Sequence, residues 1–431
     1  MLRLKQSSTF LSTYTADVSG VCSALYELGG MVIMHDASGC NSTYSTHDEP
    51  RWYQMDSMIY ISALTEIDAM LGNDEKLIVD ACKAAKDLSP RFIAICGSPI
   101  PMLMGTDFTG IARVIEDRTG IPTLGINTDG MHSYLYGIDM ALLAFVKKFC
   151  RRECEKTVAM KDIICDRVSD TTVQDNFVHD NLVRDNLVQS NIVTGMKPCI
   201  NLLGVTPLDF SITGNVESMK AIFEQNGYRI NSCFAMGSTM EEMSLAGNAE
   251  VNVLVSSAGL STARYLQETF GIPYVIGIPM GVEFTKVLFA AIDRARGSKD
   301  NQFPAEDILI DKQEAPVYII GEPIFASSLR YTLWREFGYG NIMVLSPLET
   351  DSQFLTKADS YLPYEKEIRE RIMDAAMVIA DPLYRRIVKK GSETVFIDFP
   401  HEAYSGRIYR DEIPNFIEKD LNKWFEKERM K

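Results

Sequence analysis

Three cysteines are placed so that their thiols could act together as soft metal ligands. Cys40 lies in the loop after the apolar run MVIM at 31–34, Cys96 ends the run RFIAIC at 91–96, and Cys22 precedes the first of these runs. Thiolates suit iron–sulfur clusters, and loops at the ends of strands can bring together ligands that are distant in the sequence. The alternative is that each cysteine is a small, buried apolar residue.

Several common catalytic motifs are absent from the sequence. There is no GxxxxGKS or GxxxxGKT phosphate-binding loop, no GxGxxG after a predicted strand, and neither CxxC nor HExxH. ATP hydrolysis by such a loop and dehydrogenation with a nicotinamide or flavin cofactor are therefore not expected. With five histidines, a multi-histidine metal centre is not expected either, and the CxxxC spacing of Cys150 and Cys154 is interpreted as incidental.

Short apolar runs alternate with helical patterns in three successive units. This rhythm predicts an α/β protein with three Rossmann-like domains, each with a central parallel sheet flanked by helices, and with ligands at the carboxyl ends of strands between the domains. The expected strands lie at 31–34, 91–96 and 121–126, at 200–205, 228–232, 251–256 and 274–278, and at 316–321, 342–345, 377–380 and 394–399. The clearest helical patterns lie at 75–88, 219–225, 262–270 and, as an amphipathic C-terminal helix, 415–429.

The expected domains are residues 1–165, 197–310 and 311–431, with residues 166–196 as a linker or insert. Within this insert the tract at 175–193 repeats every five residues, with an asparagine in register in each repeat. A pentapeptide β-helix needs many more coils than this tract supplies. We interpret it as an expanded linker rather than a binding element.

The composition is that of an ordinary globular protein with excess negative charge. Of 431 residues, 46% are hydrophobic, and 43 Lys plus Arg against 58 Asp plus Glu give a net charge of −15. Such a field repels nucleic-acid phosphates and anionic lipids, so neither nucleic acid nor membrane is an expected partner. The sequence lacks a signal-peptide pattern and a stretch of about 20 apolar residues, so we expect a cytoplasmic protein whose nine cysteines stay reduced.

Four segments together resemble the nitrogenase component 1 family. They are GGMVIMHDASGC at 29–40, SALTEIDAMLGNDEKL at 62–77, FIAICGSPIPMLMGTD at 92–107 and FGIPYVIGIPMG at 270–281. The family includes the molybdenum–iron protein chains, their cofactor-assembly homologues, and the light-independent protochlorophyllide, chlorophyllide and coenzyme F430 precursor reductases. The likeness covers essentially the whole chain outside the repeat tract and implies the same three-domain fold.

The resemblance implies an iron–sulfur cluster, expected to be 4Fe–4S, at an interface between homologous chains. In the family, three cysteines of the first domain bind it. Cys40 occupies the second of the family's three cysteine positions. Pro99 occupies the third, and Cys96 lies three residues before it. The first position falls near Ala16, and Cys22 lies downstream of it. Two alternatives stay open: Cys22, Cys40 and Cys96 form a rearranged site, or a partner chain completes the ligand set.

The cofactor cysteine of nitrogenase itself is absent. The segment VNVLVSSAGLSTA at 251–263 aligns with the cysteine segment but carries Ser256 and Ser257. A hydroxyl is a poor ligand for an iron–sulfide cofactor, so dinitrogen reduction is not expected. Ser257 stays a candidate contact to a second metallocofactor or a tetrapyrrole.

His401 aligns with the family's histidine segment. The resemblance implies that His401, with Tyr404 and Arg407 nearby, supplies protons or binds an anion in the interdomain cleft, because reductive chemistry needs a proton with each electron. The alternative is a surface or structurally satisfied histidine.

As a whole, the resemblance implies an oxidoreductase. Its subunit would receive electrons from a separate ATP-dependent iron–sulfur reductase and pass them through the interface cluster to a substrate in the interdomain cleft. The expected partner is a homologous chain, in a homo- or hetero-oligomer. Two other functions stay open: a scaffold for metallocofactor assembly, and a non-catalytic binding protein on the same fold.

Overall fold

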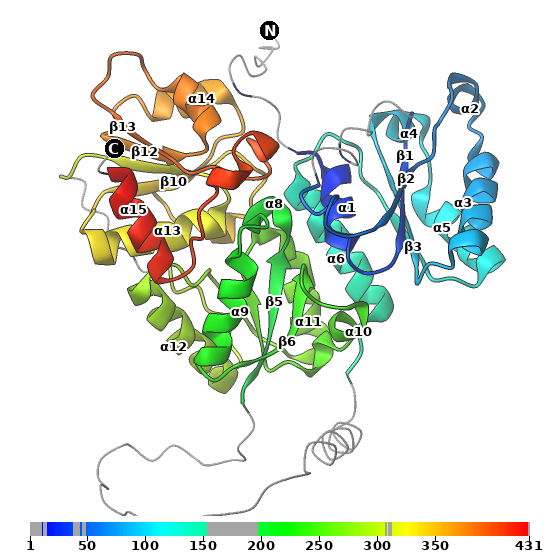
Figure 1. The fold of residues 1–431 in the computed structure, drawn as a ribbon, viewed down its shortest axis with the longest axis horizontal. Coiled ribbons are helices and arrows are strands. Elements are labelled where there is room, and N and C mark those ends of the chain that lie inside the picture. Colours follow the sequence, from blue (N-terminus) through cyan, green and yellow to red (C-terminus); the bar gives the residue numbers. More distant parts are fainter. Residues whose placement is uncertain are drawn as a thin grey trace, which may run out of the picture.

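The computed structural model describes residues 15–37, 49–152, 197–306 and 313–429, together with Leu11, Tyr44 and Ile308. Cys40 and the repeat tract at 175–193 lie outside these residues. Three parallel sheets, each accompanied by helices, are arranged around a common centre (Figure 1). The predicted α/β class with parallel sheets flanked by helices is confirmed.

The first domain contains α1 (Asp17–Leu25), β1 (Met31–His35), β2 (Met58–Ile61), α2 (Glu66–Leu71), α3 (Asp74–Leu88), β3 (Ile93–Gly97), α4 (Pro99–Met104), α5 (Phe108–Thr119), β4 (Thr123–Ile126) and α6 (Tyr134–Phe149). Its four parallel strands have the order β2-β1-β3-β4, with Met31 paired to both Ile93 and Met58. Helices α3 and α5 cover one face of this sheet, and α1 and α6 cover the face toward the rest of the molecule (Figure 1).

The second domain contains β5 (Cys199–Val205), α8 (Pro207–Phe210), α9 (Asn215–Gln225), β6 (Arg229–Ala235), α10 (Met240–Ser244), β7 (Val251–Leu254), α11 (Leu260–Phe270), β8 (Tyr274–Ile276) and α12 (Val282–Ser298). Its strands are parallel in the order β6-β5-β7-β8. Its main hydrophobic cluster is continuous with those of both other domains. One hydrophobic cluster therefore extends through all three domains, and the first and third domains each have a further cluster of their own.

The third domain contains β9 (Val317–Ile320), α13 (Pro323–Phe337), β10 (Ile342–Ser346), β11 (Ser360–Tyr361), α14 (Glu365–Arg371), β12 (Met377–Ala380), β13 (Val395–Asp398) and α15 (Lys419–Arg429). Its five parallel strands have the order β11-β10-β9-β12-β13. The C-terminal helix α15 packs beside α13, with the rings of Phe337 and Phe425 4.7 Å apart (Figure 1).

Local sequence accounts for these elements. Strands β1, β3 and β9 are short apolar runs that are buried at every position, as expected for parallel sheets covered on both faces. Helix α3 begins with Asp74 and Glu75, whose charges favour a helix N-terminus, and it buries Leu77 and Ile78. Among the described residues, no helix is long and apolar enough to cross a membrane.

Helices α1 and α6 approach closely because glycines face backbone atoms where they meet. A Cβ atom on Gly137 would lie 1.9 Å from the Asp17 carbonyl oxygen, and one on Gly20 would lie 2.2 Å from the Tyr134 carbonyl oxygen. Any other residue at these positions requires one helix to move. All nine residues of α1 are buried.

Some elements are not indicated by the sequence patterns. The helical period of α6 is obscured by apolar residues on most of its surface, and β2 and β11 have only four and two residues. Helix α15 begins at Lys419 rather than at 415, because Asn415 and Phe416 instead form hydrogen bonds to the start of α9. The domain limits at 165, 196 and 310 fall outside the described residues, so that division stays a prediction.

Substitution of Gly137 by alanine should destabilise the protein, because the new methyl group meets the Asp17 carbonyl, which cannot rotate away. We expect the free energy of unfolding to fall by about 2 kcal/mol or more in urea denaturation. The matched control is Gly297→Ala in α12, where a Cβ atom meets nothing within 4 Å. Alanine there should raise the free energy of unfolding by at most about 1 kcal/mol. Equal effects of the two substitutions would contradict the close helix contact.

Candidate functional site

The carboxyl ends of strands from all three sheets converge on one carboxylate, that of Asp209. Asp209 lies in the short helix α8, directly after β5. Tyr134 begins α6 in the first domain, Ser256 follows β7 in the second, and His401 follows β13 in the third. The turns that follow these strands thus bring together side chains that are distant in the sequence. We call the group of Asp209, Tyr134, Ser256 and His401 the junction.

Asp209 accepts hydrogen bonds from different domains. The Tyr134 hydroxyl donates to Oδ1 over 2.5 Å, and the Ser256 hydroxyl donates to Oδ2 over 2.6 Å. The Nε2 atom of His401 lies 3.4 Å from Oδ1, and the side chains of Asp209 and His401 are only 6% and 10% exposed. Burial and the neighbouring Asp209 charge raise the pKa of Tyr134 well above its usual value, so the phenol stays a hydrogen-bond donor.

Glu322 lies beside this group at the start of α13. Its Oε2 atom accepts a 2.7 Å hydrogen bond from the Phe325 amide and caps the helix, while its Oε1 atom accepts a 2.9 Å bond from the Ser257 amide. Burial and the negative charge of Asp209 raise the pKa of Glu322 to about 7. The carboxyl group therefore changes its protonation near neutral pH.

Both ring nitrogens of His401 face protein groups. Nδ1 accepts a hydrogen bond from the Ala403 amide at 3.3 Å, which leaves Nε2 as the N–H that points to Asp209. The His401 amide donates to Asp381, whose pKa is raised by burial, and the Tyr404 ring packs edge-on against the imidazole with centroids 4.9 Å apart. The backbone of Arg407 lies in the turn at Gly406–Ile408, and its side chain is outside the part of the chain that the structure describes.

The junction does not fit a second iron–sulfide cofactor. The groups nearest to the expected ligand positions are hydroxyl and carboxylate oxygens, which are hard donors, and the imidazole of His401 is engaged on both sides. Ser257, which stands where the family has its cofactor cysteine, has no thiol, and its backbone amide donates a hydrogen bond to Glu322. The catalytic roles of His401, Tyr404 and Arg407 stay predictions.

Two of the three predicted cluster cysteines are neighbours. Cys22 lies in α1 and Cys96 near the end of β3, and both side chains are fully buried. Burial raises the pKa of the Cys22 thiol well above its usual value, and the adjacent Cys96 thiol raises it further. In the absence of a cation, the Cys22 sulfur is therefore a thiol rather than a thiolate.

This pair fits two ligands of an iron–sulfur cluster, because a bound iron supplies the positive charge that deprotonates a thiol. Among the described residues, no group of three or more His, Cys, Asp or Glu side chains is arranged to hold a metal ion. Cys40 lies outside them, and the structure describes its neighbour Tyr44, which donates to Glu49 beside Cys22. Tyr44 also forms a hydrogen bond with Ser23 of α1, so this residue lies next to the helix that carries Cys22.

The sequence analysis did not identify four residues of this site, which are Asp209, Tyr134, Glu322 and Asp381. A local signal exists for three of them. Pro207, Pro323 and Pro382 each follow an apolar strand and open a helix or turn, and each has an acidic residue directly before it or two positions after it. Nothing local marks Tyr134, whose role depends on the position of α6.

Comparison with known proteins agrees with this architecture. The profile of the nitrogenase component 1 type oxidoreductase family matches residues 18–319. A chain of three parallel-sheet domains with strand ends converging on one junction thus belongs to a known class of redox protein. The chain is a member of the nitrogenase component 1 type oxidoreductase family, and the resemblance seen in its sequence is confirmed.

Two relatives with similar sequences have different functions. One is a component chain of the light-independent protochlorophyllide reductase of Chlorobium luteolum, which is 27% identical over 215 residues, covering 43% of this chain and 41% of that protein. The nitrogenase iron-molybdenum cofactor biosynthesis protein NifE of Methanosarcina barkeri is 22% identical over 247 residues, covering 57% of this chain and 47% of that protein. The matches thus span less than half the length of these relatives.

Solved structures show the same fold over the whole chain. A structure of nitrogenase Cp1 at pH 6.5 superposes with a TM-score of 0.65 and 16% identity, covering 100% of this chain and 95% of that one. A second, of nitrogenase Cp1 at pH 5, has a TM-score of 0.61 and 13% identity, covering 99% of this chain and 90% of that one. At such identities the likeness shows the fold.

The Glu322 carboxyl group should make stability depend on pH. Its pKa is about 7 in the folded protein against an ordinary value of 4.5, so it binds its proton more tightly when folded. Its contribution is fully present below pH about 4.5 and is lost as pH rises through about 7. Wild-type stability in urea should therefore fall between pH 5 and pH 8, and Glu322→Gln should reduce that fall.

The control is Glu283→Gln, at a glutamate whose side chain is 44% exposed and whose pKa is lowered by Lys286. This change should leave the slope nearly unaltered or alter it slightly in the opposite sense. If the stability of Glu322→Gln fell with pH as steeply as that of the wild type, Glu322 would be ionised throughout the range from pH 5 to pH 8.

Proposed function

We propose that this chain is a cluster-carrying subunit of a nitrogenase-like reductase. The observation that carries the proposal is that the Cys22 and Cys96 thiols are adjacent, because this joins two of the three cysteines of the rearranged cluster site. Cys40 would complete this chain's share of the ligands. The cluster, when bound, supplies one-electron transfer, and electrons would come from a separate ATP-dependent iron–sulfur reductase.

The surroundings of the cysteines suit an electron relay. Cys22 and Cys96 lie in an apolar environment that excludes water. Beside them, the buried Glu49 carboxylate accepts hydrogen bonds from Ser23 and Arg51, which ties the segment after Cys40 to α1. A rigid, dry setting keeps small the reorganisation that accompanies electron transfer, and it holds the sulfurs in one geometry.

A homologous chain is the proposed partner, and an apolar surface on the first domain would receive it. The α2–α4 surface consists of the side chains of Ile67, Met70, Leu71, Ile100, Met102 and Leu103, which are 38 to 81% exposed. Helices α2 and α4 lie on the outer part of the first domain, away from the junction (Figure 1). A contiguous apolar surface of this kind marks a protein interface.

A second candidate is a scaffold for metallocofactor assembly. The similarity to the cofactor biosynthesis protein NifE and the presence of Ser257 at the cofactor cysteine position favour it. A scaffold must release its cargo, whereas a reductase keeps its cluster through many turnovers. Transfer of bound iron to an acceptor protein during incubation would support the scaffold, and unchanged iron after multiple turnovers would support the reductase.

The cluster assignment predicts iron that depends on specific cysteines. Protein purified without oxygen together with its homologous partner should contain about four irons per pair of chains, with matching acid-labile sulfide. Cys40→Ala and Cys22→Ala should each lose most of this iron and the electron paramagnetic resonance signal of the reduced protein. Cys82→Ala is the control, because that half-buried cysteine of α3 lies outside the proposed site.

The two variants separate the alternatives for the ligand set. Loss of iron in Cys40→Ala but not in Cys22→Ala would mean that the partner chain completes the site. Wild-type protein with no iron would rule out the cluster and leave a binding protein on the same fold.

The partner proposal predicts a charge-sensitive interface at the α2–α4 surface. Met70→Glu should dissociate the complex in sedimentation velocity, because it places a charge in an apolar contact. Met70 is 79% exposed in the chain, and Met373, which is 65% exposed in the third domain, provides a matched control as Met373→Glu. Dissociation by both substitutions or by neither would contradict this placement of the partner.

A further inference from the structure

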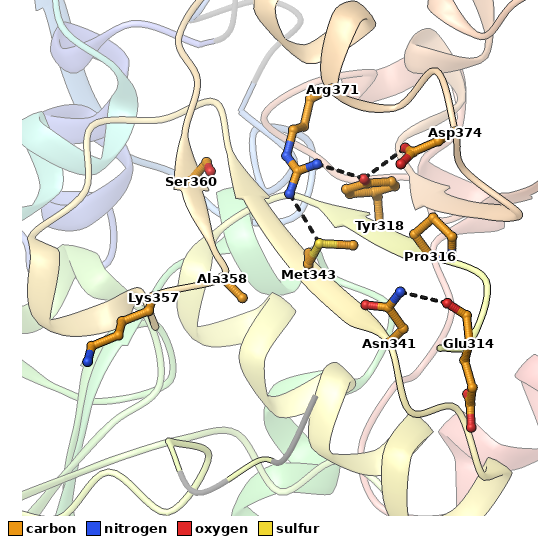
Figure 2. Close-up of a pocket in the computed structure, with 10 residues that line it drawn as sticks. All are labelled: Glu314, Pro316, Tyr318, Asn341, Met343, Lys357, Ala358, Ser360, Arg371 and Asp374. Atoms are coloured by element: carbon orange, nitrogen blue, oxygen red, sulfur yellow. Dashed lines mark hydrogen bonds between the residues drawn. The ribbon is translucent and has the colours of Figure 1, made fainter. Parts of the chain in front are cut away.

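A cavity of about 500 Å³ lies in the third domain where strands β9 and β10 begin. Pro316 and Asn341 immediately precede these strands and line it, together with side chains of β11 and α14 (Figure 2). The junction around Asp209 lies at the opposite, carboxyl ends of the strands. The cavity is therefore separate from the site described above, and its size is that of a small-molecule site.

The guanidinium of Arg371, the last residue of α14, points into this cavity (Figure 2). One Nη atom donates to the Tyr318 hydroxyl at 3.0 Å, and the other lies 3.2 Å from the Met343 sulfur. The guanidinium carbon is 5.2 Å from the centre of the Tyr318 ring. These contacts use two of the five N–H groups of a guanidinium and leave the others for a ligand.

Arg371 differs in its partners from the other arginines that are buried or half-buried. Arg51, Arg330 and Arg410 each face a carboxylate at 2.9 Å or less. No carboxylate among the described residues forms an ion pair with Arg371 within 4.0 Å. A half-buried cation held only by a phenol and a thioether is incompletely neutralised, and an anion that enters the cavity would supply the missing charge.

The groups around Arg371 restrict the size and charge of that anion. The Tyr318 hydroxyl donates to Asp374 at 2.9 Å, so a carboxylate lies on the far side of the phenol. Asp374 would repel a dianion such as phosphate more than a single negative charge. Met343, Pro316 and Ala358 add apolar surface to the wall, and Ser360 adds a hydroxyl.

We propose that the cavity binds a small organic monocarboxylate with an apolar body, whose carboxylate is gripped by the Arg371 guanidinium. A planar guanidinium can present two parallel N–H groups to a carboxylate, which a lysine cannot. The apolar body then lies against Met343 and Pro316. This site is independent of the cluster and of the proposed reductase function.

The probe is 4-fluorobenzoate, observed by fluorine NMR during titration of the full chain. Wild-type protein should give saturable binding in the millimolar range or tighter, and unlabelled benzoate should displace the probe. Arg371→Gln should weaken binding at least tenfold, and Arg371→Lys should weaken it less because the charge remains. Arg369→Gln, at an exposed arginine of the same helix, is the control and should bind as wild type does.

Three results would overturn the proposal. They are the absence of saturable binding to wild-type protein, equal affinity in Arg371→Gln and wild type, and displacement of the probe by inorganic phosphate as effectively as by benzoate. The retained charge in Arg371→Lys keeps the test informative if Arg371→Gln fails to fold.

Discussion

A carboxylate buried where three domains meet must be surrounded by hydrogen-bond donors, and Asp209 imposes this requirement on the whole chain. An unpaired charge in such a place costs several kcal/mol. Hydroxyl donors come from α6 of the first domain and from the turn after β7 in the second, and the His401 imidazole of the third domain lies 3.4 Å from Asp209. The placement of the domains and the turns at these strand ends are therefore fixed together.

The contacts around Asp209 also determine which polar side chains remain available to bind a ligand or a metal. Direct hydrogen bonds occupy the junction, and the imidazole of His401 is engaged at both nitrogens. The adjacent thiols Cys22 and Cys96 lie in the first domain, which also carries the exposed α2–α4 surface. Under the proposed function the first domain would carry electron transfer and association, whereas the third domain has a separate cavity at Arg371.

The sequence predicted the strands well and the junction poorly, for a physical reason. Buried parallel strands such as β1 and β5 are continuous apolar runs, so their composition identifies them without knowledge of the fold. Helix α6 is apolar on most sides, and β2 pairs along only four residues, so neither has a distinctive period. Asp209 and Tyr134 become significant only when separate domains meet, and no local pattern contains that information. Resemblance to the family indicated His401 and the segment at 251–263, but not the donors that surround them.

The contact between α1 and α6 has a consequence for the order in which the chain can fold during synthesis. All nine residues of α1 are buried, yet α6, against which Gly20 packs, ends at Phe149. More than a hundred residues must leave the ribosome before α1 meets this partner, and contacts between such distant segments form late. Until then the surface of α1 is exposed to water and to other chains. A nascent chain stalled before Phe149 would therefore depend on a chaperone to shield its first helix.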